Sequence, residues 1–392
     1  MPRHAASPRS WPQTGRFMDV IFSGAHYVLS FAAVISVIVF IHEFGHFMVA
    51  RLCGVKVEVF SIGFGRELLG RTDRHGTRWK LALWPVGGYV KMFGDAGAAS
   101  TPDGENLTKM SDAEKRVSFH YKPLWAKALI VVAGPTANFL LAISVFTYFI
   151  FTVGLASTQP VVGEVMPGTP AAEAGLQAGD TILKVDNKRM RRFNDIPDAI
   201  MTNLGTPVEL TIARNGETFT RSLTPIAFDD VDALGNPVKR PLIGIRSEQL
   251  TYENVGLLSA IGIATQKTYE MCVTSLRVLG QMITGDRSTE ELKGPLGIAK
   301  LSGEVTQVGE SFGETFRMFL WFIALLSVNL GLVNLLPIPM LDGGHLAFYG
   351  IEALRGRPLA ERFQEYSFRF GFVVIASLMA FTLFNDVRQM VL

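Results

Sequence analysis

Charged residues and cysteines are both scarce in this chain of 392 residues. Only 18% of the residues are charged, the net charge is +2, and the two cysteines are Cys53 and Cys272. A nearly neutral chain without basic runs interleaved with aromatic residues gives no indication of nucleic-acid binding. Two cysteines supply neither a disulfide framework nor a thiolate zinc site.

Four long apolar runs contain no charged residue at all. They cover residues 20–41, 128–163, 318–341 and 370–385, and a helix needs roughly 20 apolar residues to cross a bilayer. We therefore predict a polytopic α-helical membrane protein with about four transmembrane helices. Buried core helices are the alternative for each run. A signal peptide is a poor interpretation of the first run, which is long and lacks a small-residue cleavage site.

Lysine and arginine are concentrated in two of the loops between these runs. Thirteen lie in residues 42–127 and four in the short loop between the last two runs. Cytoplasmic loops carry an excess of these residues, so we predict that both loops are cytoplasmic. The N-terminal tail and residues 156–315 then lie on the opposite side. Cys53 and Cys272 are separated by the membrane in this topology, which excludes a disulfide between them.

The first loop alternates apolar and polar residues at 55–60 and again at 78–84. Such alternation is typical of strands, and glycines punctuate the region. We predict a small membrane-associated β-hairpin or sheet within residues 1–155, which also hold the tail and the first two spans. Residues 94–117 are polar and are predicted to form a loop.

Residues 156–228 are predicted to form an extracytoplasmic α+β domain, and the stretch 167–182 resembles a PDZ domain. No second copy of this pattern is legible. The expected elements are strands at 161–166 and 181–185, helices at 170–176 and 196–201, and a hairpin of 208–213 with 218–223 around Asn215-Gly216. Residues 229–315 are predicted to be a linker followed by an amphipathic helix at 255–283, and residues 316–392 hold the last two spans.

The motif that could support catalysis is His42-Glu43-Phe44-Gly45-His46, at the end of the first run. Positions i and i+4 share one face of a helix, so both imidazoles can bind one metal ion, with Glu43 close enough to activate a water molecule. Ionisable groups inside a membrane usually mark function. The alternative is a pair of interfacial histidines that extend toward the lipid headgroups.

A catalytic zinc needs a third protein ligand, and Asp342 is the candidate. The first and third spans cross in the same direction, so their ends meet at one leaflet. Pro337 and Pro339 break the helix just before Asp342, and backbone groups freed at that depth require a wet cavity or protein around them. A helix-ending turn is the alternative for Asp342. His345 is a rival ligand, which we assign to a supporting position because a carboxylate balances the charge of the metal.

The histidine motif and residues 334–343 together resemble the signature pair of the site-2 proteases, which are intramembrane zinc metalloproteases. The PDZ-like insert is similar to that of the bacterial family members that regulate sigma-E, and residues 134–138 and 294–298 also match the family pattern. The resemblance implies zinc bound by His42, His46 and Asp342, Glu43 as the catalytic residue and Asn334 as a contact to the substrate backbone. From the sequence alone, an Asn in a kinked helix is as often a helix–helix hydrogen bond.

The same resemblance implies a multi-pass protein of the bacterial inner membrane, with a periplasmic PDZ domain and an active site toward the cytoplasm. Its expected partners are membrane lipid and single-span membrane proteins, such as an anti-sigma factor or remnant signal peptides, cut in regulated intramembrane proteolysis. The PDZ domain would bind a C-terminus or exclude bulky ectodomains.

A transmembrane substrate must be extended before it is cut, and strand addition at 55–60 or 78–84 would hold it so. A plain cytoplasmic hairpin is the alternative for these segments. Two other functions remain open: a non-catalytic membrane PDZ scaffold, which needs no Glu43, and a zinc transporter, which leaves peptides intact.

Overall fold

The computed structural model describes residues 14–97, 108–157, 159–201, 203–231, 237–247 and 251–391. The predicted N-terminal tail up to residue 13 and residues 98–107 of the predicted loop lie outside this part of the chain. The helices are α1 (Thr14–Leu52), α3 (Asp112–Val117), α4 (Leu124–Val153), α5 (Pro170–Glu173), α6 (Asp195–Ile200), α7 (Leu257–Thr284), α8 (Pro295–Val308), α9 (Phe312–Asn334), α10 (Asp342–Arg355) and α11 (Glu361–Val391). The strands are β1 (Val57–Thr72), β2 (Arg78–Met92), β3 (Leu155–Ser157), β4 (Val162–Val165), β5 (Thr181–Val185), β6 (Lys188–Arg189), β7 (Val208–Arg214), β8 (Glu217–Leu223), β9 (Ile226–Val231), β10 (Pro237–Leu242), β11 (Ile245–Ser247) and β12 (Thr251–Glu253).

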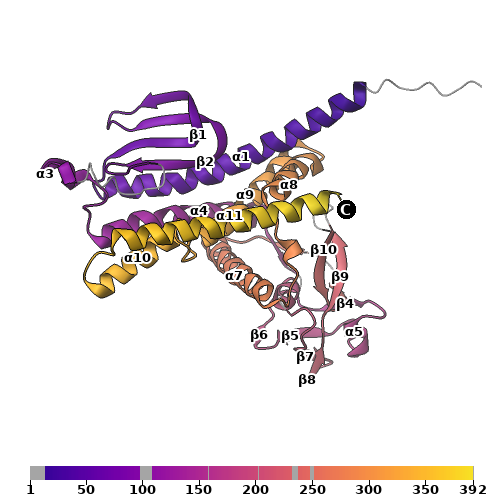
Figure 1. Cartoon of the computed structure of the whole chain (residues 1–392). Coiled ribbons are helices and arrows are strands. Elements are labelled where there is room, and N and C mark those ends of the chain that lie inside the picture. Colours follow the sequence, from indigo (N-terminus) through magenta and orange to yellow (C-terminus); the bar gives the residue numbers. More distant parts are fainter. Residues whose placement is uncertain are drawn as a thin grey trace, which may run out of the picture.

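Among the described residues, four helices are long and apolar enough to cross a membrane, namely α1, α4, α9 and α11. This confirms the predicted number of spans. The β1–β2 sheet and α10 lie toward one end of these helices, and the unit that contains β4–β8 lies toward the other (Figure 1). Helix α1 continues to Leu52, so the histidine motif lies inside a continuous helix and not at its end.

Helices α4 and α9 form the centre of the helical layer, and α1 packs against α4. These contacts depend on glycines, which allow the helix backbones to approach closely. A Cβ built on Gly45 of α1 would lie 2.4 Å from the carbonyl oxygen of Ala133, and one on Gly331 of α9 would lie 3.2 Å from that of Pro135. In a bilayer, where apolar surfaces gain little by leaving lipid, such close backbone approach is a main source of helix association.

The two long strands β1 and β2 bend and pair more than once. Residues 57–62 pair with 88–92 on one side, and residues 59–62 pair with 78–81 on the other, while residues 67–72 pair with 78–82. Phe60 and Trp79 stack within this sheet, and Phe47 of α1 packs edge-on against both rings. The predicted sheet is therefore present, and its aromatic face is fixed on the first membrane helix.

This pairing corrects our expectation about the free edges of the sheet. The segments 55–60 and 78–84 were the expected edges, but residues 59–60 and 78–81 have partners on both sides. In the described part of the chain, the edges are 88–92 and 67–72. Alternation along a strand indicates which face is buried, but it carries no information on which strand is outermost.

The α+β unit contains the predicted elements within a few residues. Strands β6, β5, β7 and β8 form a sheet, and α5 and α6 contribute to the same hydrophobic core. Asn215 and Gly216 both have positive φ, of 51° and 85°, as the predicted two-residue hairpin requires. Strand β11 pairs with β4, so the unit extends to Ser247, beyond the predicted limit at residue 228.

A buried ion pair stabilises this unit. The guanidinium of Arg214 donates to both carboxylate oxygens of Asp180, over 2.6 and 2.7 Å, and Asp180 is fully buried. Burial alone would raise the pKa of this carboxyl, but the hydrogen bonds from Arg214 and from the Gln177 amide outweigh it, and the pKa lies below its usual range. The residue that the PDZ-like pattern contributes at position 180 is therefore a structural anchor.

Three helices lie where we predicted loops or gave no helix: α3, α8 and α10. Helix α3 lies within the predicted loop 94–117, where Ser111 and Glu114 form a capping box. Helix α10 lies within the predicted loop between the last two spans. All three are too short or too polar to stand out as apolar runs, so composition alone did not reveal them.

Asp386 of α11 joins the last membrane helix to the start of α8. Its two carboxylate oxygens accept hydrogen bonds from the backbone amides of Gly294 and Gly297, each over 2.9 Å. The adjacent Asn385 donates to the carbonyls of Glu290 and Leu292. A carboxylate at a helix N-terminus satisfies amides that have no partner within the helix and interacts favourably with its dipole.

We predict that Asp386→Ala lowers the free energy of unfolding by about 3 kcal/mol, because it leaves two buried amides without an acceptor. Arg388→Ala is the matched control in the same turn. It removes an ion pair with Glu290 whose side chains are both about half exposed, and such pairs contribute about 0–1 kcal/mol. Thermal unfolding of both variants in detergent tests this. Equal melting temperatures for the two variants would contradict the assigned role of Asp386.

Candidate metal centre

Helix α1 places His42 and His46 one turn apart on the face that meets α4. Both side chains are buried. Their ring centroids lie 4.8 Å apart, and the two Nε2 atoms are separated by 3.2 Å. The i, i+4 spacing therefore brings two imidazole nitrogens to one point in the helical layer, as the motif predicts.

The third side chain reaches this point through a break in the chain. Helix α9 ends at Asn334, and α10 begins at Asp342. Between them Met340 has φ of +84°, which is strained for a residue with a side chain. Gly343 and Gly344 permit the turn, since a Cβ on either would lie within 2.4 Å of the carbonyl oxygen of Leu336 or Ile338.

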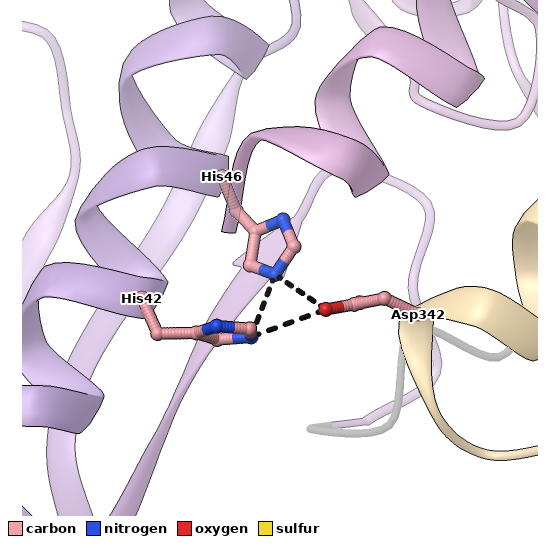
Figure 2. Close-up of side chains that lie close together, drawn as sticks. All are labelled: His42, His46 and Asp342. Atoms are coloured by element: carbon pink, nitrogen blue, oxygen red, sulfur yellow. Dashed lines mark hydrogen bonds and ion pairs between the residues drawn. The ribbon is translucent and has the colours of Figure 1, made fainter. Parts of the chain in front are cut away.

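The carboxylate of Asp342 points at both histidines (Figure 2). Its Oδ2 atom lies 3.2 Å from His42 Nε2 and 3.5 Å from His46 Nε2. One ligand atom from each of the three residues falls within 4.8 Å of the other two. Two stretches of chain almost 300 residues apart thus meet at one cluster, which is the arrangement that the sequence predicted.

The remaining nitrogen of each imidazole has a partner on α4. His46 Nδ1 lies 2.9 Å from the carbonyl oxygen of Ile130, which accepts only if Nδ1 carries the proton. His42 Nδ1 lies 3.2 Å from the side-chain amide of buried Asn138, whose Oδ1 has no other partner. Rotation of this amide by 180° lets Oδ1 accept from Nδ1–H. Both Nε2 atoms are then free of protons and available to a metal.

A glycine makes room for the imidazoles. A Cβ on Gly134 of α4 would lie 2.3 Å from Nε2 of His46 and 2.9 Å from Cε1 of His42. No side chain can occupy this position without displacing the rings. Residues 134–138, which match the family pattern, therefore contribute one wall of the cluster.

A cavity of about 300 Å³ opens onto the cluster. Glu43 lines it beside the two histidines, and the backbone amide of Val90 on β2 hydrogen-bonds to the Glu43 carboxylate. Asn334, at the end of α9, also lines the cavity, and its amide nitrogen lies 3.5 Å from His42 Nε2. All five predicted site residues therefore border one space.

His345, the rival ligand, lines the same cavity but does not belong to the cluster of ligand atoms. Its ring packs against Phe368 of α11 at 5.4 Å and against Tyr349 at 6.4 Å between centroids. The structure therefore favours a supporting position for His345. The sequence did not reveal the role of the Ile130 carbonyl, because a backbone acceptor leaves no signature in residue type. It also indicated no role for Tyr89 of β2, which lines the cavity.

The cluster suits a zinc ion. Two imidazole nitrogens and one carboxylate oxygen are a common ligand set for catalytic zinc, with a fourth position open. Asp342 Oδ2 is buried, yet no neighbour in the described part of the chain meets the geometry of a hydrogen bond to it. A buried carboxylate oxygen aimed at two unprotonated nitrogens is stable only if a cation lies between them.

Comparison with known proteins gives a consistent result over nearly the whole chain. Residues 30–378 match the model of peptidase family M50. A protein of Mesorhizobium japonicum, provisionally named a zinc metalloprotease, is 40% identical over 367 residues, which cover 92% of this chain and 98% of that protein. Metalloprotease MmpA of Caulobacter vibrioides is 40% identical over 380 residues, which cover 92% of this chain and 95% of that protein. Among solved structures, a PDZ domain of an SdrC-like protein from Listeria monocytogenes is 25% identical and matches 22% of this chain and 84% of that domain, with a TM-score of 0.18.

We predict that Gly134→Ala abolishes stoichiometric zinc binding, because the new methyl group would occupy the space of the His46 ring. Gly350→Ala on α10 is the control, since a Cβ there meets no atom within 4 Å. Metal analysis of the purified variants tests this, with thermal unfolding to verify that each is folded. A folded Gly134→Ala variant with a full complement of zinc would contradict the assigned geometry.

Proposed function

The chain belongs to peptidase family M50, the site-2 proteases, and from this premise we propose that it cleaves transmembrane segments of other membrane proteins. It is a zinc metallopeptidase and an integral membrane protein. The observation that carries the proposal is the position of the cluster: His42, His46, Asp342 and Glu43 border one cavity between helices that are long enough to span a bilayer.

In the proposed mechanism, His42, His46 and Asp342 would hold the zinc and Glu43 would move protons. The zinc would supply a Lewis acid for the scissile carbonyl and would lower the pKa of a water molecule. Glu43, one residue after His42, accepts a proton from the attacking water and later delivers it to the leaving amine. Its hydrogen bond to the Val90 amide keeps the carboxylate directed into the cavity. Asn334, which lines the same cavity, would contact the substrate backbone beside the scissile bond.

We further propose that the substrate is held as an added strand on the 88–92 edge of the sheet. A helical transmembrane segment hides its peptide groups, so a local extended conformation must form before attack. Gly88, Tyr89 and Val90 line the cavity, and this edge has no other strand beside it in the described chain. Unpaired backbone groups of an edge strand bind extended peptides by strand addition.

For the location, we propose the bacterial inner membrane with both arginine- and lysine-rich loops in the cytoplasm. The α+β unit, which we propose to be a PDZ domain, would then be periplasmic. Its position at the opposite end of the helices from the β1–β2 sheet (Figure 1) supports this arrangement. There it would keep bulky ectodomains from the site or bind a C-terminus, and single-span proteins such as an anti-sigma factor or remnant signal peptides are the proposed substrates.

A membrane scaffold or a zinc transporter explains the site less well. A scaffold has no need of a metal cluster in the helical layer, and a transporter has no need of a carboxylate beside the ligands that is hydrogen-bonded toward the cavity. Neither would require an unpaired strand edge at the same cavity.

We predict that Glu43→Gln retains zinc and lowers cleavage of a membrane-spanning reporter by at least about a hundredfold, the usual contribution of a general base. Glu310→Gln, at an exposed position, is the control for the loss of one negative charge. Metal analysis and gel-based cleavage in detergent or liposomes provide the measurements. Unchanged cleavage by Glu43→Gln would refute the proteolytic mechanism.

We also predict where a trapped substrate lies on the sheet. In the Glu43→Gln background, a photo-crosslinker at Tyr89 or Lys91 should react with the transmembrane segment of a substrate, and the attachment site should shift along the substrate between the two positions. The same probe at Leu69 or Arg71, on the opposite edge, is the control and should not react. Attachment from the opposite edge, or a single site for both probes, would rule out strand addition at 88–92.

A further inference from the structure

A second cavity, of about 330 Å³, lies where α1 ends and the chain turns into the β1–β2 sheet. It shares no lining residue with the cavity of the metal centre. Its wall includes the side chains of Arg51, Lys56 and His75, together with Gly54 and Thr77. Most of the side chains with hydrogen-bonding capacity around it are therefore cationic or can become so.

Lys122, two residues before α4, is not itself a lining residue, but its amine lies beside Gly54, which lines the cavity. Its Nζ atom lies 3.4 Å from where a Cβ on Gly54 would be. Gly54 has φ of +69°, which favours glycine, so the wall of the cavity carries no side chain at this position beside the Lys122 amine. The backbone geometry itself leaves the cavity open.

The cations differ in how far their charge is compensated. The guanidinium of Arg51 is fixed by Asp73 at 2.6 Å, by Thr77 at 3.2 Å and by the ring of Phe47. Lys56 and Lys122, in contrast, form no ion pair with the described residues, although the Glu114 carboxylate interacts electrostatically with Lys56. Lys56 lies over the ring of Phe93 at 5.1 Å.

Asp73 is already committed to several donors. It accepts hydrogen bonds from the indole of Trp79 and from the backbone amides of His75 and Thr77 as well as from Arg51. Burial raises the pKa of this carboxyl slightly, but these hydrogen bonds outweigh it and lower the pKa to about 2. Asp73 therefore stays ionised and orients one wall of the cavity, and its hydrogen-bonding capacity is used by donors other than the two lysines.

The cavity lies at the level where a membrane surface is expected. It follows the last turn of one spanning helix and precedes the first turn of another. Large side chains next to Arg51 and Lys122 in the sequence are exposed: Leu52 to 81%, Trp125 to 67% and Tyr121 to 47%. Exposed aromatic residues at the ends of membrane helices lie at the headgroup level, and basic pockets between such helices bind phosphorylated headgroups.

We propose that this cavity binds the phosphate group of an anionic phospholipid, with Lys56, Lys122 and Arg51 around the phosphate and Gly54 leaving space for it. Charge-assisted hydrogen bonds from amines and a guanidinium are the usual means of phosphate recognition. A soluble phosphate ester offers the same group, but the exposed Leu52 and Trp125 give acyl chains a surface that a soluble ester would not use.

The test compares ligands and variants in the purified full-length protein in detergent. Short-chain phosphatidylglycerol, short-chain phosphatidylcholine and glycerol phosphate are titrated, and binding is measured by native mass spectrometry and by the shift in melting temperature. The variant Lys56→Gln/Lys122→Gln removes the two lysines that form no ion pair with the described residues. Lys109→Gln/Lys184→Gln, with two exposed lysines that do not line the cavity, removes the same charge elsewhere.

We expect saturable binding of phosphatidylglycerol, at least tenfold weaker binding of phosphatidylcholine and of glycerol phosphate, and a loss of about tenfold or more in the Lys56/Lys122 variant alone, because each lysine near a phosphate contributes about 1 kcal/mol. Glycerol phosphate that binds as tightly as the lipid, with the same loss in the variant, would support the phosphate site and overturn its assignment to a lipid. Equal binding of the two lipids, or equal affinities of the two double variants, would overturn the proposal. None of these readouts depends on proteolysis.

Discussion

The close contact between α1 and α4 is the constraint on which the rest of the structure depends. Gly45 lets the two backbones approach, and Gly134 leaves space for the His46 and His42 rings. Apolar surfaces gain little from one another in lipid, so fit and hydrogen bonds must hold such helices together. Here the hydrogen bonds from the imidazoles to Ile130 and Asn138 serve both purposes: they join the helices, and they set which nitrogen faces the metal.

The second requirement is an interruption of the membrane helix that follows. A carboxylate at the end of a continuous α9 would point along the helix surface, whereas Asp342 must point inward at two histidines. Pro337 and Pro339 cannot continue the hydrogen-bonding pattern, and Met340 adopts a positive φ. Such irregular backbone is tolerated at membrane depth only beside protein or water. The cavity is therefore both the reason why the break is tolerated and the space that the chemistry needs.

Features that depend on residues close together in the sequence could be predicted, whereas features that depend on distant contacts mostly could not. The spans and the hairpin at Asn215-Gly216 depend on local composition and turn geometry, and the meeting of His42, His46 and Asp342 follows from helical spacing combined with the direction of the spans. The order of the β1–β2 sheet could not be predicted, because a strand that alternates in one way can be central or outermost. Helices α8 and α10 were missed since their stability comes from contacts such as Asp386 with Gly294, far away in the chain.

The β1–β2 sheet connects the two cavities. Through this sheet, a lipid bound at the proposed site would affect the position of the substrate-binding edge. Residues 57–62 form a central strand that pairs with the cavity-lining edge 88–92. At its start, Val57 lines the basic cavity, and its carbonyl accepts a hydrogen bond from Thr77, which also contacts Arg51. A phosphate held by Arg51 and Lys56 would therefore fix the position of this strand along the membrane normal. Residues 88–92 pair with this strand, so their position would be fixed as well. The headgroup layer would then set the depth in the membrane at which an added substrate strand passes Glu43.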